Sequence, residues 1–272
     1  MTDLTGFIDP HVHSAPDIVP RLLDDFELAR QAAAAGLAGI LIKSHTTLTA
    51  DRATLASQVV PGMRIWGGLV LNHAVGGFNP AAVEAAVGFG AREVWMPTID
   101  AANHCRVHRL PRPGLSLEEG RSTQAVRDIL AIIARHDLIL GTGHLSVPEI
   151  LALVPMAQEA GVAKILITHP EAPVTNMPFP IQRDLASFGC RFERVWVFTT
   201  PALKHVLTPD AVIAGIREVG HESTVLATDM GQAGNPPPVE GFRDFVDACR
   251  TAGFDDRQVR RMASENIAEW LS

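Results

Sequence analysis

Residues 164–170 read Lys-Ile-Leu-Ile-Thr-His-Pro, an apolar run that ends abruptly on the polar residue His169. Runs of this kind are typical of strands that other elements cover on both faces. Similar runs recur along the 272 residues at a spacing of about 30 residues, the length of a strand followed by a helix. The repeat predicts a parallel sheet whose strands all end on the same side of the molecule.

Eight segments fit this pattern, and segments with helical patterning lie between them. One closed (β/α)8 TIM barrel needs about 250 residues, so we expect residues 1–272 to form a single domain of this fold. An open, doubly wound sheet is the alternative, but no G-x-G-x-x-G motif follows the first expected strand. The expected strands are Gly6–Asp9, Gly39–Lys43, Arg64–Leu71, Glu93–Pro97, Leu138–Thr142, Lys164–Thr168, Val195–Thr199 and Thr224–Thr228.

Composition and charge narrow the class of protein. The chain has 23 Lys and Arg residues against 30 Asp and Glu residues, a net charge of −7, which argues against binding to nucleic acid or to anionic membranes. Its start lacks the features of a signal peptide, and its three cysteines are far apart, as is usual in a reducing compartment. We therefore expect a cytoplasmic protein that acts on a small molecule, with a homodimer as the default assembly.

The first chemical motif is the stretch Asp9-Pro10-His11-Val12-His13. Two histidines that are two residues apart on an extended chain point to the same side. Paired imidazoles suit Zn²⁺ or a similar ion, although surface or capping histidines also occur in this pattern.

Polar residues at the ends of later expected strands strengthen this interpretation. His144 follows the fifth strand, His169 the sixth and Asp229 the eighth. Each alone has a structural explanation, such as a rim histidine or a helix N-cap. Together they place several metal-ligand side chains on the carboxyl rim of one barrel, which indicates a functional site.

This order of motifs resembles the amidohydrolase superfamily of metal-dependent hydrolases, and in particular its uncharacterised single-domain members. The resemblance extends over nearly the whole chain. It implies that the metal ligands are His11, His13, His144, His169 and Asp229, and that Asp229 is also the general base for the attacking water. It further implies one or two divalent ions, with Zn²⁺ expected and Mn²⁺ or Fe²⁺ as alternatives.

The sequence departs from the superfamily at strand 4, where a bridging carboxylated Lys or a Glu is often found. The expected strand 4 has neither at its end, whereas Lys43 closes strand 2. A buried lysine is costly unless it is paired or near solvent, so we expect Lys43 to have a role in the site. Three roles fit: a carboxylated catalytic bridge between metal ions, a cation that holds a substrate carboxylate, and a salt-bridged rim lysine.

Further polar side chains at the same rim are candidates for substrate binding. His45, Asn72 and His73 follow strands 2 and 3, and Asp17 and Arg21 follow the first motif. The stretch from Asp100 to Gly120 is long and rich in His, Arg and Pro, and it fits either a lid over an acidic substrate or an ordinary surface connection.

Taken together, these features predict a metal-dependent hydrolase that activates water for attack on a small ester, lactone, amide or related acidic metabolite. Two alternatives share the motifs: a metal-dependent decarboxylase of a carboxylated metabolite, and a histidinol-phosphatase-like phosphoesterase, whose DxHxHS opening is similar to residues 9–14. A non-enzymatic metal-binding barrel is the remaining alternative.

Overall fold

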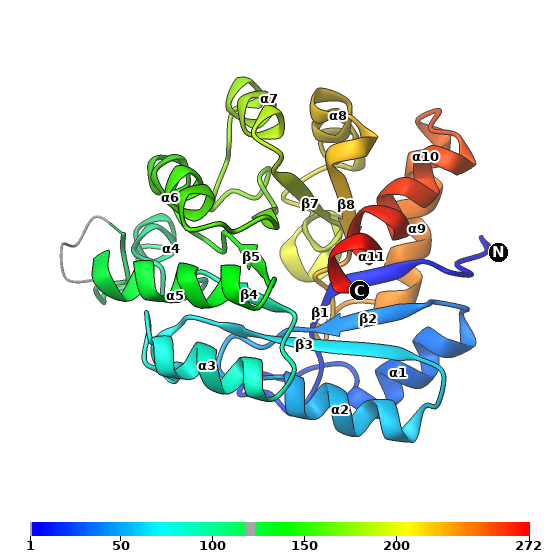
Figure 1. Cartoon of the computed structure of the whole chain (residues 1–272). Coiled ribbons are helices and arrows are strands. Elements are labelled where there is room, and N and C mark those ends of the chain that lie inside the picture. Colours follow the sequence, from blue (N-terminus) through cyan, green and yellow to red (C-terminus); the bar gives the residue numbers. More distant parts are fainter. Residues whose placement is uncertain (1, 118–122) are drawn as a thin grey trace.

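The computed structural model describes residues 2–117 and 123–272, and its eight strands are all parallel and follow the chain in order from β1 to β8. Helices lie outside the strands, and α11 crosses one end of the barrel near β1 and β8 (Figure 1). The predicted (β/α)8 barrel is therefore confirmed. Within the described ranges, no helix combines the length and apolar character needed to cross a membrane.

The strands are short, and the helices that join them differ more in length. The strands are β1 (Ile8–Val12), β2 (Gly39–Ile42), β3 (Arg64–Val70), β4 (Glu93–Trp95), β5 (Ile139–Gly141), β6 (Ile165–Thr168), β7 (Arg191–Val195) and β8 (Thr224–Ala227). The α-helices are α1 (Asp25–Ala34), α2 (Ala50–Val59), α3 (Pro80–Gly88), α4 (Ala102–Val107), α5 (Thr123–Arg135), α6 (Val147–Glu159), α7 (Phe179–Ser187), α8 (Pro209–Val219), α9 (Pro238–Thr251), α10 (Asp256–Arg260) and α11 (Asn266–Leu271). Short 3₁₀ segments lie at His73–Val75, Val197–Thr199, Pro201–Leu203 and His221–Ser223, and a π-helical turn at Arg261–Glu265 joins α10 to α11.

An apolar layer fills the interior of the barrel. Ile267 and Leu271 of α11 belong to this layer, at the end of the barrel that α11 crosses. Seven strands each contribute one residue to it: Ile8, Leu41, Val70, Trp95, Ile139, Leu166 and Val225. From β7, in contrast, the buried carboxylate of Glu193 contacts His11 of β1. The interior is therefore apolar near α11 and ionic toward the carboxyl ends of the strands.

The barrel closes where β1 meets the segment that follows β8. The backbone N–H of Asp229 donates to the carbonyl of His11 (2.7 Å), and the N–H of His13 donates to the carbonyl of Met230 (2.8 Å). The buried carboxylate of Asp9 reinforces the seam, because it accepts from both the N–H (3.0 Å) and the hydroxyl (2.6 Å) of Thr228. Closure therefore places His11 and His13 directly beside Asp229.

Two of the predicted strand boundaries were wrong. The first strand was expected at Gly6–Asp9 but spans Ile8–Val12, so His11 lies within it. The seventh was expected at Val195–Thr199 but spans Arg191–Val195, and Val197–Thr199 forms a 3₁₀ turn. The sequence of β7, Arg-Phe-Glu-Arg-Val, has no apolar run that would mark it as a buried strand. The strand is buried nevertheless, because two of its charged side chains have ionisable partners inside the protein.

The seam generates a prediction about Gly231. This residue has φ of +132°, and a Cβ at this position would overlap the carbonyl of His13. Gly231→Ala is therefore expected to lower the free energy of unfolding by about 1–3 kcal/mol, measured by chemical denaturation. Gly234→Ala is the matched control, since its Cβ would meet only the Ala202 Cβ at 3.8 Å. Equal stability of the two variants would contradict the proposed tight closure.

Candidate metal centre

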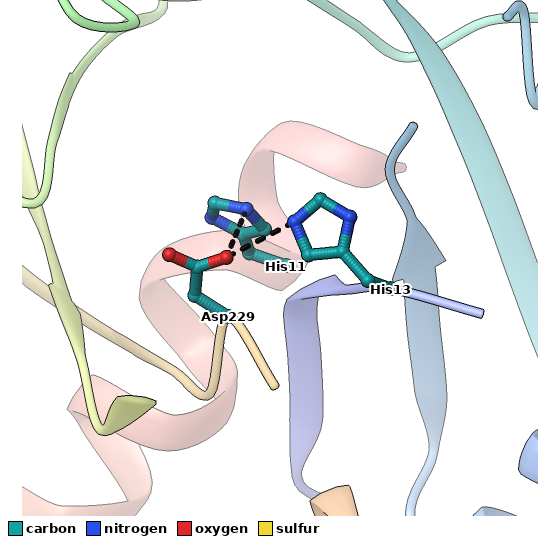
Figure 2. Close-up of side chains that lie close together, drawn as sticks. All are labelled: His11, His13 and Asp229. Atoms are coloured by element: carbon teal, nitrogen blue, oxygen red, sulfur yellow. Dashed lines mark hydrogen bonds and ion pairs between the residues drawn. The ribbon is translucent and has the colours of Figure 1, made fainter. Parts of the chain in front are cut away.

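Three side chains from the seam converge at the carboxyl end of the barrel (Figure 2). Asp229 Oδ1 lies 3.0 Å from His11 Nε2 and 3.0 Å from His13 Nε2. One ligand atom from each of the three residues lies within 4.8 Å of the others. Asp229 adopts a left-handed backbone conformation, with φ of 53°, that is uncommon outside glycine and marks functional sites more often than average.

Glu193 orients His11 from behind. Its Oε2 lies 3.1 Å from His11 Nδ1, and both side chains are fully buried. A carboxylate at Nδ1 favours the tautomer with the proton on Nδ1, which leaves the Nε2 lone pair toward Asp229 and His13. This carboxylate–histidine pair is the usual support behind a metal-ligating imidazole.

The electrostatics of His11 also favour a cation. Burial would lower its pKa, but the negative charges of Asp229 and Glu193 outweigh burial and the opposing charge of Lys43, and they raise the pKa to about 9. The two carboxylates thus stabilise a positive charge between them, which a bound divalent ion would supply in place of the proton. The two imidazoles and the carboxylate fit such an ion.

His13 has a different partner. Arg21 Nη2 lies 3.3 Å from His13 Nδ1, and Asp17 Oδ2 accepts from Arg21 Nε at 2.8 Å. Burial is the largest influence on His13 and lowers its pKa to about 4, so the ring is neutral at neutral pH. A cation on Nε2 would leave the proton on Nδ1, and Arg21 Nη2 would then need another acceptor.

His13 and Asp229 of this cluster line a cavity of about 400 Å³. Cationic side chains, imidazoles and apolar side chains also line it. The polar lining comprises His13, Arg21, Lys43, His45, His104, His108, His144, His169, Asp229 and Gln232, and the apolar lining comprises Ile99, Pro173, Val174, Phe198, Leu203 and Val206. A concave pocket that combines apolar surface with convergent polar groups is typical of a small-molecule site.

Lys43 lines this cavity just beyond the end of β2. It is 1% exposed, its Nζ lies 4.9 Å from the centre of the Trp95 ring, and Nζ has no hydrogen-bond partner within the described residues. Burial lowers the pKa of Lys43, while the charges of Asp229 and Glu193 oppose that shift. Lys43 therefore lines the cavity without a hydrogen-bond partner of its own among the described residues, and its role in the site stays a prediction.

The other two predicted ligands line the cavity without joining the cluster. His144 Nδ1 lies 2.8 Å from His104 Nδ1, and the His104 and His144 rings stack at 4.9 Å. His169 has φ of 29° and a buried Nδ1 without a partner among the residues the structure describes. Their metal-binding role stays a prediction.

The predicted substrate-binding residues divide into two groups. His45 and Arg21 line the cavity, and Asp17 holds Arg21 in place. Asn72 is fully buried, donates to Thr98 Oγ1 and accepts from the Thr98 N–H, so it links the ends of two neighbouring strands. His73 is exposed and does not line the cavity. Substrate contact by any of them stays a prediction.

The stretch from Asp100 to Gly120 contains α4, which brings His104 to the cavity, and His108, which directly follows the helix, lines the cavity as well. Arg112, from the same stretch, pairs with Asp100 rather than facing the cavity. Residues 118–120 lie outside the described residues.

Sequence reasoning missed Glu193 and Glu93. Both are fully buried at strand positions, and burial together with the charge of Glu193 raises the pKa of Glu93 well above its ordinary value. Glu93 begins its strand, so a search for polar residues at strand ends does not find it. The signal in the sequence is a carboxylate within an otherwise β-compatible segment, since buried charges are rare unless they are paired.

The fold and the site define a (β/α)8 barrel with a candidate metal centre at the carboxyl ends of its strands. Residues 6–193 match the model of DUF6282, a family of unknown function, and the chain belongs to this family. No protein of curated function matches the sequence significantly.

Solved structures with the same fold include several named as hydrolases. An amidohydrolase from Pseudomonas aeruginosa has a TM-score of 0.68 at 14% identity and covers 98% of this chain and 95% of that chain. A lactonase from Listeria monocytogenes has a TM-score of 0.68 at 14% sequence identity, and the match covers 99% of this chain and 95% of that chain. An organophosphorus hydrolase from Deinococcus radiodurans has a TM-score of 0.66 at 13% sequence identity, and the match covers 99% of this chain and 93% of that chain. These likenesses show that the chain shares the barrel fold of these enzymes, which is the fold that the resemblance to the amidohydrolase superfamily implied.

The contact between His11 and Glu193 predicts that Glu193→Gln weakens metal binding. The amide still accepts from Nδ1 but has no negative charge, so we expect Zn²⁺ affinity to fall about 10–100-fold, measured by competition with a fluorescent chelator. Glu218→Gln, which alters a surface ion pair with Arg183, is expected to leave the affinity unchanged. Equal affinities in two folded variants would rule out the supporting role of Glu193.

Proposed function

We propose that this protein is a metal-dependent hydrolase that acts on a small ester, lactone or amide, or a related acidic metabolite. The observation that carries the proposal is the convergence of His11, His13 and Asp229 beside a cavity that His13 and Asp229 line, with Glu193 in contact with His11. The names of the structural neighbours, an amidohydrolase, a lactonase and an organophosphorus hydrolase, support it.

Among divalent ions, Zn²⁺ is the best match for this set of donors. Two imidazole nitrogens and one carboxylate oxygen form a three-residue ligand set that leaves a position for water or substrate, as in catalytic zinc sites. Mn²⁺ and Fe²⁺ accept the same donors and remain alternatives. One ion accounts for the cluster of His11, His13 and Asp229. His144 and His169, whose ring centres lie 5.0 Å apart, would be the imidazole ligands available to a second ion.

The ion and Asp229 would have separate tasks in such a reaction. A divalent ion held there by His11, His13 and Asp229 would polarise a substrate oxygen and lower the pKa of water to roughly 7. Asp229 stays ionised, because His11 and His13 offset its burial and hold its pKa well below the ordinary value. Its carboxylate lines the cavity and is 14% exposed, so it can take the proton from attacking water and return it to the leaving group. The apolar wall limits competing water.

Hydrolytic activity should depend on the ion, and a panel covering several substrate classes tests this dependence. Lactones, aryl esters and N-acyl amino acids are assayed for acid release, before and after removal of metal by a chelator. We expect hydrolysis of at least one class, its loss after chelation, and its return with Zn²⁺ or Mn²⁺. Release of CO₂ from a carboxylated compound would favour the decarboxylase, release of inorganic phosphate the phosphoesterase, and no turnover with metal bound the non-enzymatic barrel.

Asp229→Asn tests the proton transfer. The neutral amide cannot accept the proton, so we expect kcat to fall by at least about 100-fold, with metal content determined in parallel to separate lost ligation from lost base catalysis. Asp184→Asn, at an exposed position of α7, is the matched control and should retain full turnover. Full turnover by Asp229→Asn would remove Asp229 from the mechanism.

A further inference from the structure

Two cationic side chains face the same cavity. Lys43 and Arg21 both line it, and the side chain of Arg21 is only 5% exposed. They are close enough that the charge of Arg21 lowers the pKa of Lys43. Like charges in a poorly hydrated pocket repel one another strongly unless an anion lies between them.

The two cations are not equally compensated. Asp17 forms a salt bridge with Arg21 at 2.8 Å and offsets its charge. The Nζ of Lys43 is buried and unpartnered within the described part of the chain. A buried donor without an acceptor costs free energy that a bound acceptor restores.

The surrounding carboxylates do not serve as that acceptor. Asp229 Oδ1 is engaged with His11 and His13, and Glu193 faces His11. Glu93 favours its neutral form because of burial and the nearby charge of Glu193. With a divalent ion balancing Asp229 and Glu193, no carboxylate is left to balance a protonated Lys43. One negative charge from a ligand would neutralise Lys43 and would oppose the effect of burial on its pKa.

We infer that Lys43, assisted by Arg21, forms a carboxylate-binding subsite, so that the substrate is a monoanionic organic acid with an apolar body. This inference rests on the proposed hydrolase function, since the same cavity holds both the ion and the acid. The apolar wall formed by Ile99, Val174, Phe198 and Leu203 accommodates the body. The cavity of about 400 Å³ restricts it to small-metabolite size. Lys43 then acts as a cation rather than as a carboxylated bridge between two ions.

Matched acids and amides test the subsite. Zinc-loaded protein is titrated calorimetrically with butyrate, hexanoate and phenylacetate and with the three corresponding primary amides, which have nearly the same shape without the charge. We expect at least one acid to bind about 10-fold or more tightly than its amide, the effect of one charge-assisted hydrogen bond. If no acid binds more tightly than its amide, the inference is wrong.

Lys43→Met assigns the effect to the residue. The variant keeps the length and apolar stem of lysine, and we expect it to lose the preference for acid while it retains one equivalent of zinc. Lys204→Met is the matched control, because Lys204 is exposed beside the cavity residue Leu203, and it should keep the preference. If Lys43→Met proves unfolded in thermal melting, Arg21→Met is tested instead, with a smaller loss of preference expected and an unchanged preference counting against the subsite.

Two results with folded Lys43→Met would overturn the inference. A preserved acid preference would mean that the ion alone binds the acid. A loss of zinc would mean that Lys43 is part of the metal centre, as a carboxylated lysine would be. The proposed hydrolase function is judged separately: metal-dependent hydrolysis without acid preference leaves it standing, and acid preference without hydrolysis leaves only the subsite.

Discussion

Closure of the barrel between its first strand and the chain after its last strand is the constraint on which the centre depends. The hydrogen bonds that close the seam run from the backbone of Asp229 to His11 and from that of His13 to Met230. The residues whose backbones close the barrel are therefore the residues whose side chains form the cluster. A closed barrel fixes this register as a consequence of folding, so the donor atoms are preorganised before any ion binds, and little conformational entropy remains to be lost on binding.

Between the apolar layer and the carboxyl ends of the strands, the barrel interior contains buried ionisable groups that do not favour a stable core. Glu193, Glu93 and Lys43 are all buried, each on a different strand or directly after one. Burial of such ionisable groups carries a desolvation cost that apolar side chains packed in their place would not have. Asp229 and His169 add left-handed backbone at strand ends. Because ionic burial and strain both oppose folding, their concentration at one end of the barrel is best explained by binding and chemistry at that end.

The sequence predicted the repeat of strands and helices, because apolar runs of fixed spacing show which strands exist. It misplaced β7, since Glu193 and Arg194 remove the apolar signal from a strand whose charged side chains find their partners only in the folded chain. For the same reason Glu193 was missed, although it supports His11. The position of a residue after a strand also does not give its contacts: His144 lies at the predicted rim, yet its Nδ1 contacts His104 of α4, in the connection after the neighbouring strand β4.

The uneven lining of the cavity constrains how a substrate can lie in it. Lys43 and Asp229 are close enough for the charge of Asp229 to be the largest influence opposing the effect of burial on Lys43. The apolar lining comes chiefly from the segments that follow β6 and β7. A ligand whose acid group meets Lys43 therefore has its reacting bond near that acid group and its apolar body directed away from both. This geometry favours compounds with a carboxylate a few bonds from the scissile carbonyl over compounds with a distant charge. On such a ligand, hydrolysis would add water and cleave the acyl bond, whereas decarboxylation would break the C–C bond to the carboxylate itself and release CO₂, so the two reactions place different demands on the group that meets Lys43.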